Sequence, residues 1–263
     1  MTTVQPEPPC GDRAGRSLVG VRGVLLDIDH TLVDTEAAFV AALGASIVPL
    51  LGDQGGSESD ALLEDLLAQW SADRGGWYRA YTRGEMTHAQ QRHRRFDELL
   101  VDRGGRALTT AEYERANTVF ERAFAAAWRA FPEVPDALAR LRSAGIRLGA
   151  VTNAGRALQE AKLAAAGLAD AVPLLVTVET FGVGKPDPRV FWEGARLLGL
   201  APEEVAYVGD EPDIDADGAV AAGLRGVHLR RAGDRRFAPC DPARSGHAEA
   251  VDLLDLLELL GVA

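Results

Sequence analysis

The sequence predicts an α/β protein with a doubly wound parallel sheet and an inserted, all-helical domain. Short apolar runs that end in a polar residue alternate with helical patterns, as in buried parallel strands joined by crossover helices. Residues 35–132, which follow the first of these runs, contain only helical patterns. The chain has 263 residues, of which 47% are hydrophobic and 25% charged, so it should fold into one or two globular domains.

Domain boundaries follow from the same patterns. Residues 1–18 are proline-rich and have neither the basic start nor the apolar centre of a secretory signal, so we expect a flexible tail. The α/β core is predicted in residues 19–34 and 133–263, and an inserted helical domain in residues 35–132.

The predicted core elements lie in a regular order. Strands are expected at residues 24–26, 148–151 and 205–209, and helices at residues 135–144, 156–166, 188–198 and 251–260. Ligands of such sheets bind beyond the carboxyl ends of the strands. Asp27, Thr152 and Asp210, which follow the three strands, are therefore expected to gather in one crevice.

Composition restricts the partners of the protein. A formal net charge of -11 disfavours nucleic-acid binding, which requires a surplus of lysine and arginine. No apolar stretch has the length of a membrane helix, so no membrane partner is expected. The two cysteines, Cys10 and Cys240, are interpreted as free thiols in a reducing cytoplasm. The predicted partner is a small anionic substrate. The sequence gives no prediction of the oligomeric state.

The polar residues after the strands suit phosphoryl transfer. This reaction needs an oxygen nucleophile, an acid for the leaving group, donors for the phosphoryl oxygens and a divalent cation. Asp27 is predicted to attack and Asp29 to act as the acid. Thr152 and Lys185 would hold the phosphoryl group, while Asp210 and Asp215 complete an oxygen-rich Mg²⁺ site. One other lysine, Lys162, occurs in the chain.

The order of these residues resembles the haloacid dehalogenase (HAD) superfamily, in particular its phosphatases with a Rossmann-like core and a helical C1 cap. The matching segments are Asp27-Ile28-Asp29-His30-Thr31-Leu32, Val151-Thr152-Asn153, Gly184-Lys185-Pro186-Asp187-Pro188, and Gly209-Asp210 through Asp215 to Gly218-Ala219. Four motifs in the right order make the resemblance specific.

The resemblance implies a role for each motif residue. Asp27 would form a phospho-aspartyl intermediate and also bind the metal. Asp29 would protonate the leaving group, then activate water, and lend its backbone carbonyl to Mg²⁺. Thr152, Asn153 and Lys185 would bind the phosphate, and Asp210 and Asp215 the metal. Two positions depart from the pattern: His30 replaces the usual glycine, and Ile214 replaces an asparagine, which leaves Asp213 as an alternative to Asp215.

Substrate specificity is expected to come from the cap. The candidate substrate contacts are His30, Arg83, Arg92 and Arg95. The alternative for His30 is a structural role, and the alternative for the arginines of the predicted helix is a solvated basic face. A capping box at Thr87 and Gln90 predicts the start of the helix that carries the last two.

The predicted function is hydrolysis of a small phosphomonoester, a phosphoric monoester hydrolase reaction that depends on Mg²⁺. Within the superfamily, Asp29 argues against carbon–halogen hydrolysis, and the absence of lysine from residues 35–132 against phosphonate cleavage. A sugar-phosphate mutase remains the main alternative. A phospho-accepting signalling protein is disfavoured by the order of the residues. In such proteins an acidic pair comes first and the acceptor aspartate later, whereas here the predicted nucleophile Asp27 comes first.

Overall fold

The computed structural model of the chain describes residues 18–52, 60–82, 84–232 and 246–262. Cysteines 10 and 240, Arg83 and nearly all of the predicted tail lie outside these ranges. The chain forms two compact units, Met1–Asp34 with Arg129–Ala263, and Thr35–Trp128. We call the first the α/β unit and the second the helical unit.

A parallel sheet forms the centre of the α/β unit. In the described part of the chain it has six strands in the order β3-β2-β1-β4-β5-β6. Their bounds are β1 Gly23–Leu26, β2 Arg147–Val151, β3 Leu175–Val176, β4 Val205–Gly209, β5 Arg225–Leu229 and β6 Ala248–Ala250. The predicted fold class is therefore confirmed. Strand β1 lies between β2 and β4, so its end is flanked by the ends of two other strands.

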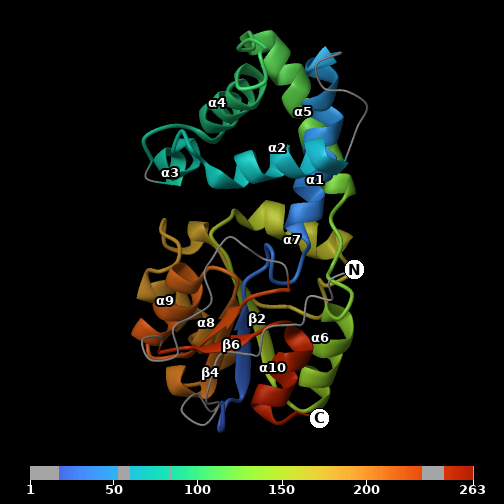
Figure 1. Cartoon of the computed structure of the whole chain (residues 1–263). Coiled ribbons are helices and arrows are strands. Elements are labelled where there is room, and N and C mark those ends of the chain that lie inside the picture. Colours follow the sequence, from blue (N-terminus) through green and yellow to red (C-terminus); the bar gives the residue numbers. More distant parts are fainter. Residues whose placement is uncertain (1–17, 53–59, 83, 233–245, 263) are drawn as a thin grey trace. The chain divides into compact units, whose positions relative to one another are not determined.

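Helices pack on both faces of this sheet (Figure 1). They are α6 Val134–Ser143, α7 Arg156–Ala165, α8 Pro188–Leu198, α9 Asp217–Ala221 and α10 Leu253–Leu260. The side chain of Asp187 caps α8, and Gly199 ends the helix in a left-handed conformation. Apolar residues of α8 and α9 form one buried core with residues of β1, β2 and β4.

The helical unit contains only helices among its described residues. These are α1 Thr35–Ser46, η2 Val48–Leu50, α2 Asp60–Ala72, α3 Trp77–Thr82, α4 His88–Val101 and α5 Thr110–Ala126. The capping box predicted at Thr87 and Gln90 begins α4. An aromatic cluster that includes Trp70, Phe96 and Phe120 fills its core. None of the described helices has both the length and the apolar character needed to cross a bilayer.

Candidate active site

The end of β1 places Asp27 between the ends of its two neighbours. Leu26 is in register with Ala150 of β2 and with Val208 of β4. The backbone N–H of Asp27 continues the ladder and donates to the carbonyl of Val208, 2.9 Å away. Thr152 and Asp210 directly follow β2 and β4. Parallel strands therefore bring three residues that are distant in the sequence to one edge of the sheet.

A cluster of three carboxylates occupies this edge. One oxygen each from Asp27, Asp210 and Asp215 lies within 4.8 Å of the other two, and all three side chains are buried. Oxygen ligands of this kind suit a hard divalent cation such as Mg²⁺. The carboxylate of Asp29 is not part of this group.

Lys185 provides positive charge to the cluster. Its Nζ lies 2.5 Å from Oδ1 of Asp27 and 2.7 Å from Oδ1 of Asp215. Burial by itself lowers the pKa of Lys185, but attraction to Asp215 and Asp27 outweighs burial and holds the pKa well above its usual value. The ammonium group therefore stays charged.

One lysine does not neutralise three buried carboxylates. Burial raises the pKa of Asp27 well above its usual value, and repulsion from Asp215 and Asp210 raises it further against the attraction of Lys185. A proton on Asp27 would remove its ability to attack. Three carboxylates and one ammonium leave a formal charge of two minus, which a divalent cation balances. The donor set and the charge of the cluster therefore fit Mg²⁺.

The loop after β4 selects Asp215 rather than Asp213. Asp215 lies in the π-helical turn Pro212–Ala216 and is buried, whereas Asp213 is exposed. Oδ2 of Asp215 accepts a hydrogen bond from the backbone N–H of Glu211 at 3.1 Å. A Cβ on Gly209 would lie 2.2 Å from this oxygen, so a glycine there makes room for the carboxylate. Ile214 does not prevent Asp215 from joining the cluster.

Tyr207 is a buried partner of Lys185 that sequence reasoning missed. Its hydroxyl lies 2.8 Å from Nζ of Lys185 and donates to the carbonyl of Val151 at 2.9 Å. The hydroxyl oxygen is 3.4 Å from Oδ1 of Asp215. In the sequence, Tyr207 is one more apolar residue of a buried strand, and only its polar tip hints at this role.

Asn153 holds the loop that carries Lys185. Its side-chain Oδ1 accepts from the backbone N–H of Lys185 at 2.6 Å, and its Nδ2 donates to the carbonyl of Lys185 at 3.0 Å. A Cβ on Gly184 would lie 2.2 Å from Oδ1 of Asn153, so this contact needs a glycine. The side-chain amide is thus directed at the protein backbone, and phosphate binding by Asn153 stays a prediction.

Thr152 is held as a hydrogen-bond donor. Its Oγ1 accepts from the backbone N–H of Ala154 at 3.2 Å and from Nε2 of Gln159 at 3.0 Å. A hydroxyl has two acceptor positions and one hydrogen. Two incoming donors use both acceptor positions, so the hydrogen of Thr152 is the part that can serve an anionic ligand.

Asp29 is bound by two side chains of α7. Lys162 forms an ion pair with Oδ1 of Asp29, and Nε2 of Gln159 donates to Oδ2 at 2.7 Å. Both partners are fully buried, whereas about a third of the Asp29 side chain is exposed. Sequence reasoning assigned no role to either partner. The signal that could have found them is the rarity of lysine together with the three-residue spacing of Gln159 and Lys162.

His30 has a backbone conformation that glycine favours. Its φ is 57°, in the left-handed region, and its N–H donates to the carbonyl of Val33 at 3.0 Å. This explains on physical grounds why a glycine would suit the position. A substrate contact by the His30 side chain stays a prediction.

Arg92 and Arg95 make contacts within the helical unit. Arg92 bonds to Asn117 and Glu121, both at 2.9 Å. The guanidinium of Arg95 lies 3.5 Å from the centre of the Trp70 ring and donates to the carbonyl of Trp70 at 2.6 Å. Burial lowers the pKa of Arg95 to about 10. Neither arginine lies on a freely solvated face.

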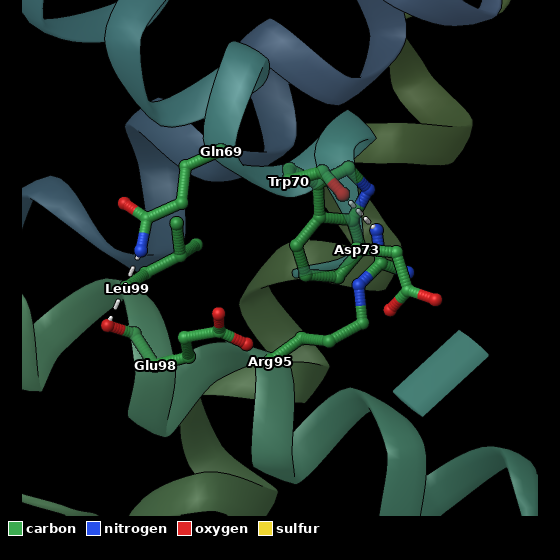
Figure 2. Close-up of a pocket in the computed structure, with 6 residues that line it drawn as sticks. All are labelled: Gln69, Trp70, Asp73, Arg95, Glu98 and Leu99. Carbon is green, nitrogen blue, oxygen red and sulfur yellow. Dashed lines mark hydrogen bonds between the residues drawn. The ribbon is translucent and has the colours of Figure 1, made fainter. Parts of the chain in front are cut away.

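A small pocket lies beside Arg95 in the helical unit (Figure 2). Its lining residues are Gln69, Trp70, Asp73, Arg95, Glu98 and Leu99. The guanidinium of Arg95 points at the Trp70 ring and carbonyl in this view. The pocket contains none of the four sequence motifs, and substrate contacts by Arg92 and Arg95 stay predictions.

Comparison with known proteins identifies the family. The sequence model of the haloacid dehalogenase-like hydrolases matches residues 21–223. This chain belongs to that family. The match spans all four motifs and the whole helical unit, so the HAD resemblance in the sequence is confirmed.

Two relatives show the range of the family near this chain. A phosphoserine phosphatase of Thermus thermophilus is 39% identical over 63% of this chain and 63% of its own length. The chain thus aligns with less than two thirds of that relative. A glyceraldehyde 3-phosphate phosphatase of Methanopyrus kandleri is 32% identical over 80% of this chain and 84% of its own length.

Solved structures share the fold. The HAD-hydrolase YfnB of Bacillus subtilis, crystallised with magnesium, is 24% identical, covers 92% of this chain and 99% of its own, and superposes with a TM-score of 0.71. A likeness at this level of identity supports the fold, and the chemistry is argued below from the residues of this chain.

Proposed function

We propose that this HAD hydrolase is a Mg²⁺-dependent phosphatase that removes phosphate from small phosphorylated metabolites through a phospho-aspartyl intermediate on Asp27. The observation that carries the proposal is the buried group of Asp27, Asp210, Asp215 and Lys185 at the end of β1. The two relatives described above are named as phosphatases of small phosphorylated metabolites, which supports the same class of substrate.

In this proposal Asp27 is the nucleophile, and Asp29 is first the general acid and then the general base. A carboxylate oxygen of Asp27 attacks phosphorus, the bond from phosphorus to the ester oxygen breaks, and that oxygen takes the proton of Asp29. Asp29 then accepts a proton from water, whose oxygen attacks the phosphorus of the aspartyl phosphate. The bond from phosphorus to Asp27 breaks, which releases orthophosphate and restores both side chains.

Thr152 and Lys185 bind and orient the phosphoryl group in this proposal. The hydroxyl hydrogen of Thr152 is available to a phosphoryl oxygen because Ala154 and Gln159 already donate to its oxygen. Lys185 holds Asp27 in place at 2.5 Å and adds positive charge beside the transferring group. Tyr207 and Asn153 keep Lys185 in this position from its side chain and its backbone.

Asp27, Asp210 and Asp215 would hold the Mg²⁺ ion, together with the backbone carbonyl of Asp29 that the HAD resemblance implies. A bound Mg²⁺ supplies the positive charge that offsets repulsion between the attacking carboxylate and the phosphate oxygens. The same charge favours the ionised form of Asp27, whose pKa burial raises.

The intact pair of Asp27 and Asp29 separates this function from dehalogenation. Hydrolysis of a carbon–halogen bond releases a halide ion, which needs no proton from an acid. Asp29 is retained here and held by two side chains. The acidic residues Asp210 and Asp215 after β4 would likewise bind a metal, which favours phosphoryl chemistry.

The test is phosphate release from a panel of phosphomonoesters, with the natural chain compared with Asp27→Asn. The panel includes phosphoserine, glyceraldehyde 3-phosphate, sugar phosphates and p-nitrophenyl phosphate. A carboxamide at position 27 cannot attack, so turnover should fall by at least about 10⁴-fold. Asp213→Asn, which removes an exposed acid near the same site, should leave turnover within about twofold.

Three outcomes would overturn the proposal. Undiminished hydrolysis by Asp27→Asn would exclude this nucleophile. Isomerisation of sugar phosphates with little release of phosphate would identify a mutase. Stable labelling by acetyl phosphate without turnover would indicate a phospho-accepting signalling protein.

A further inference from the structure

Helix α7 buries a lysine against the residue that acts as the acid in the proposed function. Lys162 has 2% of its side chain exposed and pairs with Asp29, which is 133 residues away along the chain. A buried ammonium group is retained only where a charged or polar partner compensates for the loss of water. Here one partner is a carboxylate that must also move a proton.

Gln159 contacts the same carboxylate from one turn earlier in α7. Its Nε2 donates to Oδ2 of Asp29 at 2.7 Å and to Oγ1 of Thr152 at 3.0 Å. One amide nitrogen therefore joins the acid of the proposed reaction to the hydroxyl proposed to bind phosphate. With Lys162 on Oδ1, both oxygens of Asp29 are held.

The orientation of the Gln159 amide leaves its oxygen without a hydrogen bond among the described residues. A carboxylate accepts hydrogen bonds but does not donate them, so the NH₂ end of the amide faces Asp29. The opposite end, Oε1, is buried and has no hydrogen-bond partner among the residues that the structure describes. Buried polar atoms of this kind are rare in folded proteins and often lie at functional sites. The amide nitrogen of Gln159 thus donates to Asp29 and Thr152, while its own oxygen stays unsatisfied.

The chain connects these residues closely. Thr152 directly follows β2, Gly155 is the N-cap residue of the following helix, and Gln159 and Lys162 lie three residues apart on α7. Side chains at this spacing share a helix face. One short segment after β2 thus presents the hydroxyl, the amide and the ammonium group together.

We propose that Gln159 and Lys162 are positioning residues, which fix the carboxyl group of Asp29 for proton transfer to the leaving group and keep the hydroxyl of Thr152 directed at the phosphate. The inference rests on the proposed phosphatase function and deepens it. Neither residue touches the reacting atoms: each acts through Asp29 or Thr152.

The consequence is an effect that depends on the leaving group. An alkyl phosphate such as glycerol phosphate releases a strongly basic alkoxide, which needs the proton of a well-placed acid. p-Nitrophenyl phosphate releases a phenolate that is stable near neutral pH and needs this proton much less. Loss of acid positioning should therefore slow the alkyl ester selectively, whereas a general loss of structure should slow both esters equally.

The test compares kcat/KM for these two esters in the natural chain and in Lys162→Met, which keeps a long, unbranched side chain without the charge. We expect kcat/KM for the alkyl ester to fall about 10- to 100-fold, and for p-nitrophenyl phosphate by less than about threefold. Gln159→Leu should show the same selectivity, with an added fall for both esters because Thr152 loses a donor. Thermal melts verify that each variant is folded.

Two controls separate positioning from other effects. Arg156→Gln removes a basic group of α7 that bonds to Glu160 and to the carbonyl of Leu175, away from Asp29, and should leave both esters unchanged. In an Asp29→Asn background, Lys162→Met should change the residual alkyl-ester rate by less than about threefold, because its effect passes through the missing acid.

The outcomes distinguish this inference from the proposed function. Equal losses for both esters in Lys162→Met, or a full additional loss in the Asp29→Asn background, would overturn the positioning role even if Asp27→Asn is inactive. Absence of phosphatase activity in the natural chain would instead overturn the proposed function.

Discussion

Replacing Asp210 by asparagine should raise the melting temperature of the metal-free protein and remove most of its stabilisation by Mg²⁺. The variant keeps the size of the side chain but removes one charge from the cluster with Asp27 and Asp215. Without a cation these charges repel each other inside the protein. With the cation they are the ligands, so the same substitution has opposite effects in the two conditions.

The expected magnitude follows from the spacing of the carboxylates. Two unit charges 4.8 Å apart repel by about 3.5 kcal/mol at an effective dielectric constant of about 20. Asp210→Asn removes two such repulsions, but proton uptake by Asp27, whose pKa is already raised, relieves much of the strain in the natural chain. A net gain of about 1–3 kcal/mol remains, or roughly 3–10 °C in the melting temperature of a chain of this size.

The assay is a thermal melt of the natural chain and of Asp210→Asn, each in EDTA and in Mg²⁺. A ligand at 100 times its Kd stabilises the folded state by about 2.7 kcal/mol, so Mg²⁺ should raise the melting temperature of the natural chain by about 5–10 °C. The variant should gain less than a third of this shift. Asp213→Asn, with its exposed side chain, is the matched control and should behave like the natural chain in both buffers.

Two results would refute this reasoning. If Asp210→Asn melts below the natural chain in EDTA, repulsion within the cluster is not what limits the metal-free protein. If the variant keeps the full Mg²⁺ shift, the ion binds elsewhere.

Two further substitutions test supporting contacts. Tyr207→Phe removes a hydroxyl that contacts both Lys185 and the carbonyl of Val151. We expect the free energy of unfolding in urea to fall by about 1–3 kcal/mol, and kcat to fall as well. An unchanged urea midpoint would contradict this expectation. Arg95→Met removes the contacts with the Trp70 ring and carbonyl; a loss of about 1–2 kcal/mol is expected. Arg79→Met on α3 is the control. If KM rises in Arg95→Met but not in this control, Arg95 also contacts the substrate.

The strand ends of the site could be predicted because the information is local. The apolar runs before Asp27, Thr152 and Asp210 specify buried strands, and parallel pairing then brings their ends to one edge. Strands β3, β5 and β6 were not predicted. Strand β3 has only two residues, and β5 begins with an exposed arginine shortly after the end of α9, so neither gives a clear pattern.

The partners of the motif residues could not be predicted in the same way. Gln159 and Lys162 read as ordinary members of an amphipathic helix, and only the packing of α7 beside the end of β1 joins them to Asp29. The choice of Asp215 over Asp213 likewise depends on a π-helical turn and on the space beside Gly209. Neither feature has a known pattern in the sequence.

The sequence by itself determined the order of the motifs, the α/β class and the residue types available for phosphoryl chemistry. These depend on hydrophobic periodicity and on residue identity, which act over short stretches of chain. Only the tertiary structure decided which carboxylates meet, that Lys185 is shared by Asp27 and Asp215, and that α7 holds Asp29. The physical reason is that the contacts of Lys185 with Asp27 and of Gln159 with Asp29 join segments more than a hundred residues apart, and they form only when these segments pack together.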